Sequence, residues 1–110
     1  MIVLLFKSQL RPDVDEQDYR ATRAHMMDLV QKIPGFLSYK TFRADDGETV
    51  AIAKFETEGA LEVWRQHPEH MAAQRRGHEE FYASYSIQVC QAVRDYGWSR
   101  AQRGVSAGST

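Results

Sequence analysis

The chain has 110 residues, a formal charge of −1, 43% hydrophobic residues and 26% charged residues. These values are typical of an ordinary globular domain, and a chain of this length can bury one core without disulfides. A chain so close to neutrality has no general attraction for phosphate backbones or anionic lipids, so neither nucleic acid nor a membrane is expected as a partner. No segment reaches the roughly 18 apolar residues that a membrane span requires.

The start of the chain and its cysteine content bear on location. The run from Met1 to Phe6 is apolar but lacks a basic leader and a small-residue cleavage site, so a buried strand explains it better than a secretory signal. Cys90 is the single cysteine and cannot form an intrachain disulfide, which suits a reducing compartment. The sequence therefore predicts a cytoplasmic protein, with Cys90 as a buried, unreactive thiol.

The first elements in the chain are predicted to be a strand and a helix. Residues 1–10 are β-rich and apolar on both sides at first, which predicts a strand covered from two directions. A helix over residues 15–32 follows, because apolar side chains recur at intervals of three and four and form one stripe. The members of the stripe are Tyr19, Thr22, Met26, Leu29 and Ile33, of which Thr22 is polar.

A hairpin is predicted next. A Pro-Gly pair stops the helix, and two β-rich runs follow at residues 36–43 and 49–56. The Asp-Gly pair in the five residues between them indicates a hairpin turn.

Two helices and a last strand are expected after the hairpin. Thr57 can cap a short helix that ends near residue 66, and Pro68 suits the first turn of another helix that ends near residue 83. Alternation of apolar and polar side chains over residues 84–94 predicts the last strand. Beyond Trp98, the tail of residues 99–110 has no aromatic side chain and is expected to be flexible or to pack on a partner.

The order β, α, β, β, α, β is that of an α+β domain with a ferredoxin-like topology, in which the helices cover one face of a four-stranded antiparallel sheet. We expect residues 1–98 to form this domain. The other face would carry large apolar side chains in either register, and soluble monomers seldom leave such a patch open. Pairing of two sheets in a homodimer is the simplest cover.

Side chains capable of chemistry gather on the last predicted helix. His70, Gln74, His78, Phe81 and Tyr82 fall near one stripe. A His and a Gln on a mostly apolar stripe need polar partners or a cavity, since unpaired burial costs roughly 1 to 3 kcal/mol. Each histidine is therefore a satisfied core residue, a residue at the edge of the helix or a pocket residue, and the pattern alone leaves these interpretations open.

Other chemistries find less support in the sequence. His67, His70 and His78 have spacings of three and eight, without a nearby Cys or paired acidic ligand, so no metal is expected. Trp64 can be a packing residue or a wall against which a ligand stacks. The sequence contains no nucleophile elbow, phosphate-cradling loop or Ser/His/Asp arrangement.

Two segments of the chain resemble those of a known family. One is Ile33-Pro34-Gly35-Phe36; in the other, Phe55-Glu56 is followed by Trp64 and then by His67-Pro68-Glu69-His70. Over residues 1–98 the chain resembles the antibiotic biosynthesis monooxygenase family of dimeric α+β barrels. The resemblance implies a monooxygenase, an oxidoreductase that oxidises a small quinol-like or phenolic aromatic substrate with O2 and uses no cofactor.

The resemblance also suggests roles for the candidate residues. His78 or His70 is expected as the catalytic base, because an imidazole with a pKa near about 6.5 can help to ionise a phenol. The expected substrate-binding residues are Phe55, Trp64, Gln74, Phe81 and Tyr82. Among these, Gln74 is the donor that would orient the substrate. The first alternative is a dimer of the same fold that binds a small ligand without turnover.

The further alternative is a haem-degrading monooxygenase. That branch of the family carries an Asn on the first strand and a His ten residues after the Trp, where this chain has Lys7 or Ser8 and Gln74. An amide is not a plausible axial ligand for haem iron. Haem binding would therefore require His70 or His78 and a shifted pocket.

Overall fold

The computed structural model describes residues 1–100. Its elements are β1 (Ile2–Leu10), α1 (Glu16–Val30), β2 (Phe36–Arg43), β3 (Thr49–Phe55), α2 (Glu58–Arg65), α3 (Pro68–Arg76), the π-helix η1 (Gly77–Phe81) and β4 (Tyr82–Gln91). The predicted element order is confirmed. The expected tail lies, from residue 101 onward, outside the described residues.

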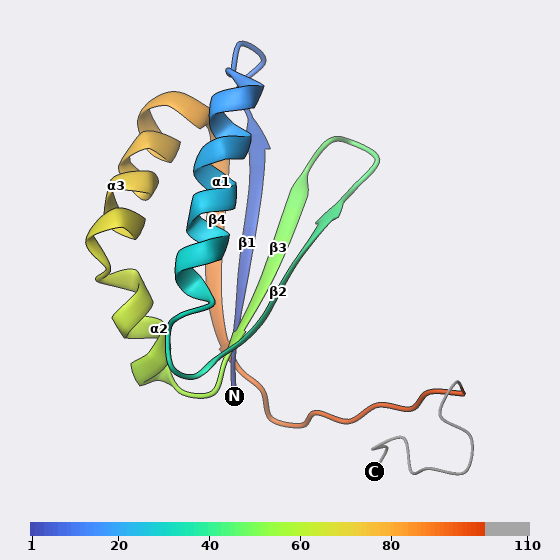
Figure 1. Ribbon diagram of the computed structural model, residues 1–110. Helices are drawn as coiled ribbons and strands as arrows, with labels where there is room; N and C mark the ends of the chain where they lie inside the picture. The colour runs from blue at the N-terminus through green and yellow to red at the C-terminus, as the bar shows by residue number, and fades with distance from the viewer. Residues whose placement is uncertain (101–110) are drawn as a thin grey trace.

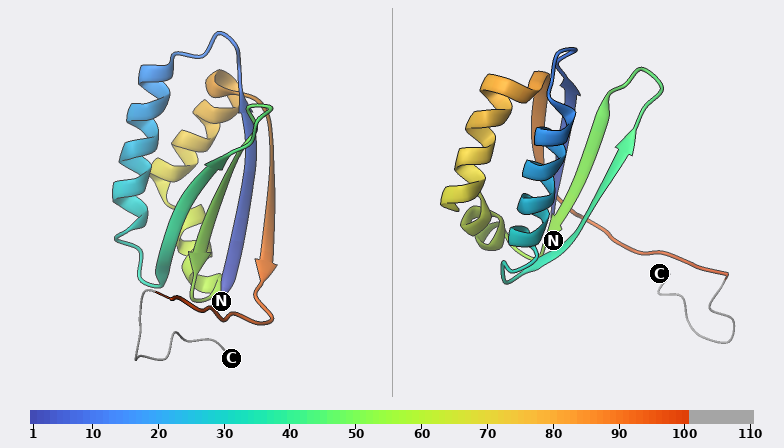
Figure 2. Two further views of the ribbon diagram at one scale, coloured as in Figure 1. Left: turned by 90° about the vertical axis from the view of Figure 1, so that its right-hand side faces the viewer. Right: turned by 45° about the horizontal axis from the view of Figure 1, so that its top comes forward.

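The strands form one antiparallel sheet in the order β2-β3-β1-β4. The helices all lie on one side of this sheet (Figure 1, Figure 2), which confirms the predicted ferredoxin-like arrangement. Within residues 1–100, no helix or strand covers the opposite face, and no helix is long and apolar enough to cross a membrane.

The face of the sheet that points away from the helices is called here the open face. Side chains alternate between the two faces of a strand, and Leu4 and Phe6 point to the helix side. Their neighbours and the paired residues of the other strands therefore make up the open face, whose apolar members are Val3, Leu5, Phe42, Val50 and Ile52. Cys90 pairs with Val3 on this face and is exposed in the single chain, which contradicts the predicted burial of its thiol.

Side chains that cap the helix N-termini fix where α2 and α3 begin. Thr57 caps α2, its hydroxyl accepting a hydrogen bond of 3.1 Å from the Ala60 N–H. His67 caps α3 in the same way, since its Nδ1 accepts from the Glu69 N–H at 3.1 Å, and Pro68 fills the first turn. The first histidine of the His-Pro-Glu-His segment is thus a helix cap.

The apolar core lies at the end of the domain where β1 begins, β3 ends and α2 packs beneath the sheet (Figure 1). Its buried members are Ile2, Val30, Ala53, Phe55, Ala60, Leu61 and Trp64. Phe55 is only 1% exposed and meets Phe36 edge-on, with 5.7 Å between ring centroids. Because these residues come from β1, α1, β3 and α2, their packing fixes the helices against one end of the sheet.

Gly35, in the turn between α1 and β2, cannot be replaced without strain. Its φ is +91°, and a Cβ at this position would lie 2.8 Å from the Ala60 Cβ. Gly47 in the hairpin also has a φ of +91°, but a Cβ there would meet nothing within 4 Å. An alanine at Gly47 would meet only the backbone cost of a positive φ, whereas an alanine at Gly35 would meet that cost and a close contact with Ala60 as well.

We expect Gly35→Ala to lower the free energy of unfolding by about 2 to 4 kcal/mol, since it combines a positive φ with overpacking. Gly47→Ala should lower it by only about 1 to 2 kcal/mol, the backbone cost alone. Urea unfolding followed by circular dichroism measures both values. Equal losses in the two variants would contradict a tight contact between Gly35 and α2.

The structure corrects the predicted end of the last helix. α3 stops at Arg76, and the chain continues as the π-helix η1, in which the Tyr82 N–H donates to the Gly77 carbonyl five residues earlier. A Cβ on Gly77 would lie 2.7 Å from the Tyr82 ring, so the close approach of that ring requires glycine. As a result, β4 begins at Tyr82 and ends at Gln91, instead of spanning residues 84–94. The other predicted boundaries differ by at most two residues.

Candidate functional site

A cavity of about 570 Å³ lies between the helices and the sheet. This volume is within the range of small-molecule sites, which is about 300 to 1,000 Å³. The cavity exists because the strands present small side chains beneath the helices: Ala51 and Ala53 on β3, Ser8 on β1 and Thr41 on β2. Larger residues at these positions would fill the space.

Aromatic rings form one wall of the cavity. Phe6 stacks on Tyr85 with 5.7 Å between ring centroids and meets Tyr82 edge-on at 5.4 Å. Burial, reinforced by the neighbouring Tyr19, raises the pKa of Tyr82 well above its ordinary value. The Tyr82 hydroxyl therefore stays neutral at physiological pH and can donate a hydrogen bond, but it cannot act as a base.

His70 and Trp64 form the opposite wall. Their rings are 4.4 Å apart between centroids, with an angle of 33° between the planes, and Trp64 is only 8% exposed. The Nδ1 atom of His70 is buried and has no hydrogen-bond partner among residues 1–100. Burial lowers the pKa of His70 to about 4, although the nearby main chain of Arg65 opposes this fall. His70 is therefore a neutral imidazole at neutral pH.

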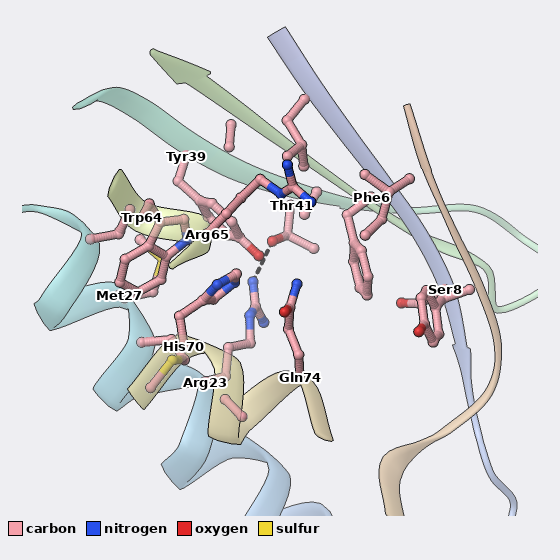
Figure 3. A pocket seen from close by; sticks show the side chains of 18 of the residues that line it. Phe6, Ser8, Arg23, Met27, Tyr39, Thr41, Trp64, Arg65, His70 and Gln74 are labelled. Atoms are coloured by element: carbon pink, nitrogen blue, oxygen red, sulfur yellow. Dashed lines mark hydrogen bonds between the residues drawn. The ribbon is translucent and has the colours of Figure 1, made fainter. Parts of the chain in front are cut away.

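Polar side chains converge on the space beside His70. Figure 3 shows the Arg23 guanidinium and the Gln74 amide pointing into this space from the helices, across from Tyr39 and Thr41 of β2. Arg23 Nη2 donates a hydrogen bond to Thr41 Oγ1 and so joins α1 to β2. The site thus combines an apolar floor with a neutral imidazole, an amide and a guanidinium.

Interactions between α1 and α3 hold the helix layer over the cavity. His25 Nε2 lies 2.7 Å from Glu69 Oε1, and this contact lowers the pKa of the Glu69 carboxyl. Arg76 donates to Asp18 at 3.2 Å and to Thr22 at 3.1 Å. Exposed ion pairs contribute only about 0 to 1 kcal/mol each, so these contacts fix geometry more than they add stability.

The cavity brings together most of the site residues that the sequence predicted. Those that line it are Phe55, Trp64, His70, Gln74, Phe81 and Tyr82. His78 does not line it: this side chain is exposed, and its ring is 6.4 Å from that of Tyr85. The chain is α-helical up to Gly77, whose N–H still donates to the Ala73 carbonyl. At 3.6 residues per turn, two steps of four residues place His78 about 80° around the helix from His70, and so outside the stripe.

Sequence reasoning missed Arg23 as a cavity residue, although a signal was present. Arg23 stands four residues after Tyr19 and three before Met26, and both of those residues belong to the predicted helical stripe. The same spacing places Arg23 on the cavity side of α1. Tyr39 and Thr41 alternate along β2 and gave no signal stronger than that of any strand.

The described residues hold no three-residue metal cluster and do not match the haem ligands of the haem-degrading branch, although His70 lines the cavity. Among residues 1–100, no group of three His, Cys, Asp or Glu side chains is placed to hold a metal ion. Ser8 and Gln74 line the cavity at the places where the haem-degrading branch carries Asn and His. Because an amide does not serve as an axial ligand, these residues do not fit haem bound in that way.

Comparisons with known proteins agree with this geometry. The family model described as antibiotic biosynthesis monooxygenase matches residues 1–76. An uncharacterized protein of Bacillus subtilis (strain 168), YqjZ, is 31% identical over 80 residues, which are 73% of this chain and 70% of the relative.

Solved structures share the fold. Rv0793 from Mycobacterium tuberculosis is 20% identical, with a TM-score of 0.75 over 87% of this chain and 98% of that one. SnoaB from Streptomyces nogalater, described as a cofactor-independent oxygenase, is 12% identical, with a TM-score of 0.70 over 86% of this chain and 94% of that one.

Proposed function

Because the chain belongs to the antibiotic biosynthesis monooxygenase family, we propose that it oxidises a small quinol-like or phenolic aromatic compound with O2 inside the cavity, without a cofactor. The observation that carries this proposal is the neutral His70 stacked on Trp64 in a cavity with aromatic walls. Such walls suit a flat aromatic ring, and a neutral imidazole can accept a proton from its hydroxyl group. The lone cysteine favours the cytoplasm as the place of this reaction.

In the proposed reaction, a phenol and O2 give a quinone and water. The ring loses one C–H bond and the phenol loses its O–H bond; one oxygen atom of O2 enters the ring as a carbonyl and the other leaves as water. The substrate supplies all the electrons, because an electron-rich phenolate can pass them to oxygen itself. The protein holds the ring, accepts the phenol proton and stabilises the anion that forms.

His70 is the proposed base, with Nε2 as the accepting atom because Nδ1 is buried. The His70 pKa of about 4 is far below that of a phenol. With a phenol pKa of about 10, proton transfer to His70 is unfavourable by about 8 kcal/mol. A cation at about 4 Å offsets roughly 4 kcal/mol of this at an effective dielectric constant of about 20. His70 therefore needs help from a charge such as that of Arg23.

Oxygen uptake tests the proposed function. We expect the protein to consume O2 with at least one member of a panel of quinols and phenols, faster than the compound oxidises by itself in the presence of a metal chelator. Ala51→Leu places a larger side chain in the cavity floor, where Ala51 is 3% exposed, and should lower this rate by about tenfold or more.

The matched control is Ala72→Leu, the same change at an exposed position of α3, which should leave the rate unaltered. Circular dichroism would confirm that both variants fold. Binding of the aromatic compounds without O2 uptake would favour a non-catalytic ligand-binding dimer instead. An equal rate in Ala51→Leu and the parent protein would remove the cavity as the reaction site.

We further propose that two copies of the chain pair through their open faces. Phe42 is 49% exposed in the single chain and pairs with Val50, while Leu5, Ile52 and Val3 lie further along the same face. Lys7, Lys40 and Lys54 also lie on this face, between the apolar side chains. A patch of this kind is rare on a monomer. A second copy presents the same surface, and a two-fold axis can bring the apolar side chains of the two copies face to face.

Ile52→Lys is expected to weaken this dimer about 100-fold or more, because it replaces an apolar side chain by a charge beside Lys40 and Lys54 on the paired faces. Sedimentation velocity at micromolar concentrations should show a dimer for the parent protein and a monomer for the variant. Val63→Lys, at a 57% exposed position of α2, is the control and should stay dimeric. A parent protein that sediments as a single chain would contradict the pairing.

A further inference from the structure

The cavity has a one-sided distribution of charge. Arg23 and Arg65 line it, and none of its lining residues is an Asp or a Glu. The last ten residues, which the structure does not describe, contain neither Asp nor Glu. The cavity lining therefore contains two guanidinium groups and no carboxylate.

Arg23 is the cation without a counter-charge. It takes part in none of the ion pairs among residues 1–100, and its hydrogen bond goes to the neutral hydroxyl of Thr41. Arg65, by contrast, lies 3.0 Å from Glu62, and Arg76 lies 2.8 Å from Glu80. A half-buried guanidinium in apolar surroundings is costly unless an anion accompanies it.

The position of Arg23 fits a ligand anion. Its side chain reaches from α1 into the space that His70 and Gln74 also face, as Figure 3 shows. A guanidinium presents parallel N–H groups that match the two oxygens of a carboxylate. An aromatic ring in the cavity could therefore place a carboxylate at Arg23 and a hydroxyl group at His70.

We propose that the substrate is an aromatic acid whose carboxylate binds Arg23, with its phenolic hydroxyl directed to His70. That this acid is oxidised rests on the proposed function, whereas its binding at Arg23 does not depend on any reaction. His70 is neutral and leaves Arg23 as the charged partner of the carboxylate. The same guanidinium lies where it can stabilise the ionised phenol, which offsets part of the unfavourable proton transfer to His70.

Binding of a matched pair of compounds tests this inference. The probes are 1-hydroxy-2-naphthoate and its methyl ester, titrated without oxygen so that turnover plays no part. Quenching of Trp64 fluorescence reports binding in a Trp98→Phe background, in which Trp64 is the only tryptophan left. We expect the acid to bind about tenfold or more tightly than the ester.

Arg23→Gln should weaken binding of the acid about tenfold or more and leave binding of the ester unchanged. Arg23→Lys keeps the positive charge but loses the parallel N–H groups of the guanidinium. This variant should retain part of the preference for the acid. Arg75→Gln, the same change at an exposed position of α3 outside the cavity lining, should alter neither affinity.

Equal affinities of acid and ester, equal losses of both in Arg23→Gln, or no binding of either compound would overturn the inference. If O2 uptake with neutral quinols persists in that case, the proposed function still stands. If the acid binds through Arg23 and no compound is oxidised, the proposed function fails while the assignment of the acid-binding residue holds.

Discussion

Replacing His70 with glutamine is expected to lower kcat for oxidation of the aromatic substrate by about 100-fold or more, as loss of a general base commonly does. Glutamine keeps a polar group of similar reach but cannot take the proton from a phenol, so KM should change little. In the parent protein, kcat/KM should rise with pH through a pKa of about 4 and stay level near neutrality. Steady-state O2 uptake measured over a pH series checks both expectations.

The control for this prediction is His78→Gln, since the His78 side chain is exposed and does not line the cavity. This variant should keep the full rate. A rate loss in His78→Gln with normal activity in His70→Gln would assign the base to His78, the other histidine of the predicted stripe. An inflection near the ordinary pKa of imidazole in the parent profile would also contradict the buried state of His70.

His70 should also make the fold sensitive to acid. Its pKa is about 4 in the folded chain against 6.5 for the unfolded side chain. Between these two pH values, His70 is protonated in the unfolded state and neutral in the folded state. Stability from this residue is therefore fully present above about pH 6.5 and is lost as the pH falls toward about 4. The expected loss is about 2 kcal/mol by about pH 5.

His70→Phe tests the effect because a phenylalanine can stack on Trp64 in the same way without titrating. The free energy of unfolding of this variant, measured in urea between about pH 7 and 4.5, should fall less steeply than that of the parent by the stated amount. His78→Phe at the exposed position should follow the parent curve. Parallel curves for the parent and His70→Phe would mean that the His70 pKa is not lowered.

The fold was predictable because its signals are local and agree with one another. Apolar periodicity of three and four in α1 and alternation in the strands set the element types, and Thr57 and Pro68 set the helix starts. None of this required knowledge of a partner or ligand.

The end of the last helix was not predictable, because η1 depends on a tertiary contact. Its wider turn allows Phe81 to be buried and Tyr82 to pack against Gly77. A glycine within a helical pattern does not reveal which ring will approach it. Phe81 and Tyr82 at the end of this turn line the cavity together with His70 and Gln74, whereas His78 is exposed and does not.

The cavity and its charge were likewise beyond the sequence alone. Small residues such as Ala51 and Ala53 read as ordinary strand positions, and only the assembled sheet shows that they leave room beneath the helices. The spacing of Arg23 from Tyr19 indicates its side of α1, but only the structure shows that its guanidinium donates to Thr41 instead of pairing with a carboxylate. That no carboxylate lines the cavity beside Arg23 becomes visible only when all the elements around the cavity are assembled.

A crystal structure with bound 1-hydroxy-2-naphthoate would test most directly whether the space between helices and sheet is the site of chemistry. The ligand ring should lie in the cavity beside Trp64, with its hydroxyl group within hydrogen-bond distance of His70 Nε2 and its carboxylate on Arg23. Binding on the open face or at the surface near His78, with the cavity closed by its own side chains, would contradict the assignment of the site.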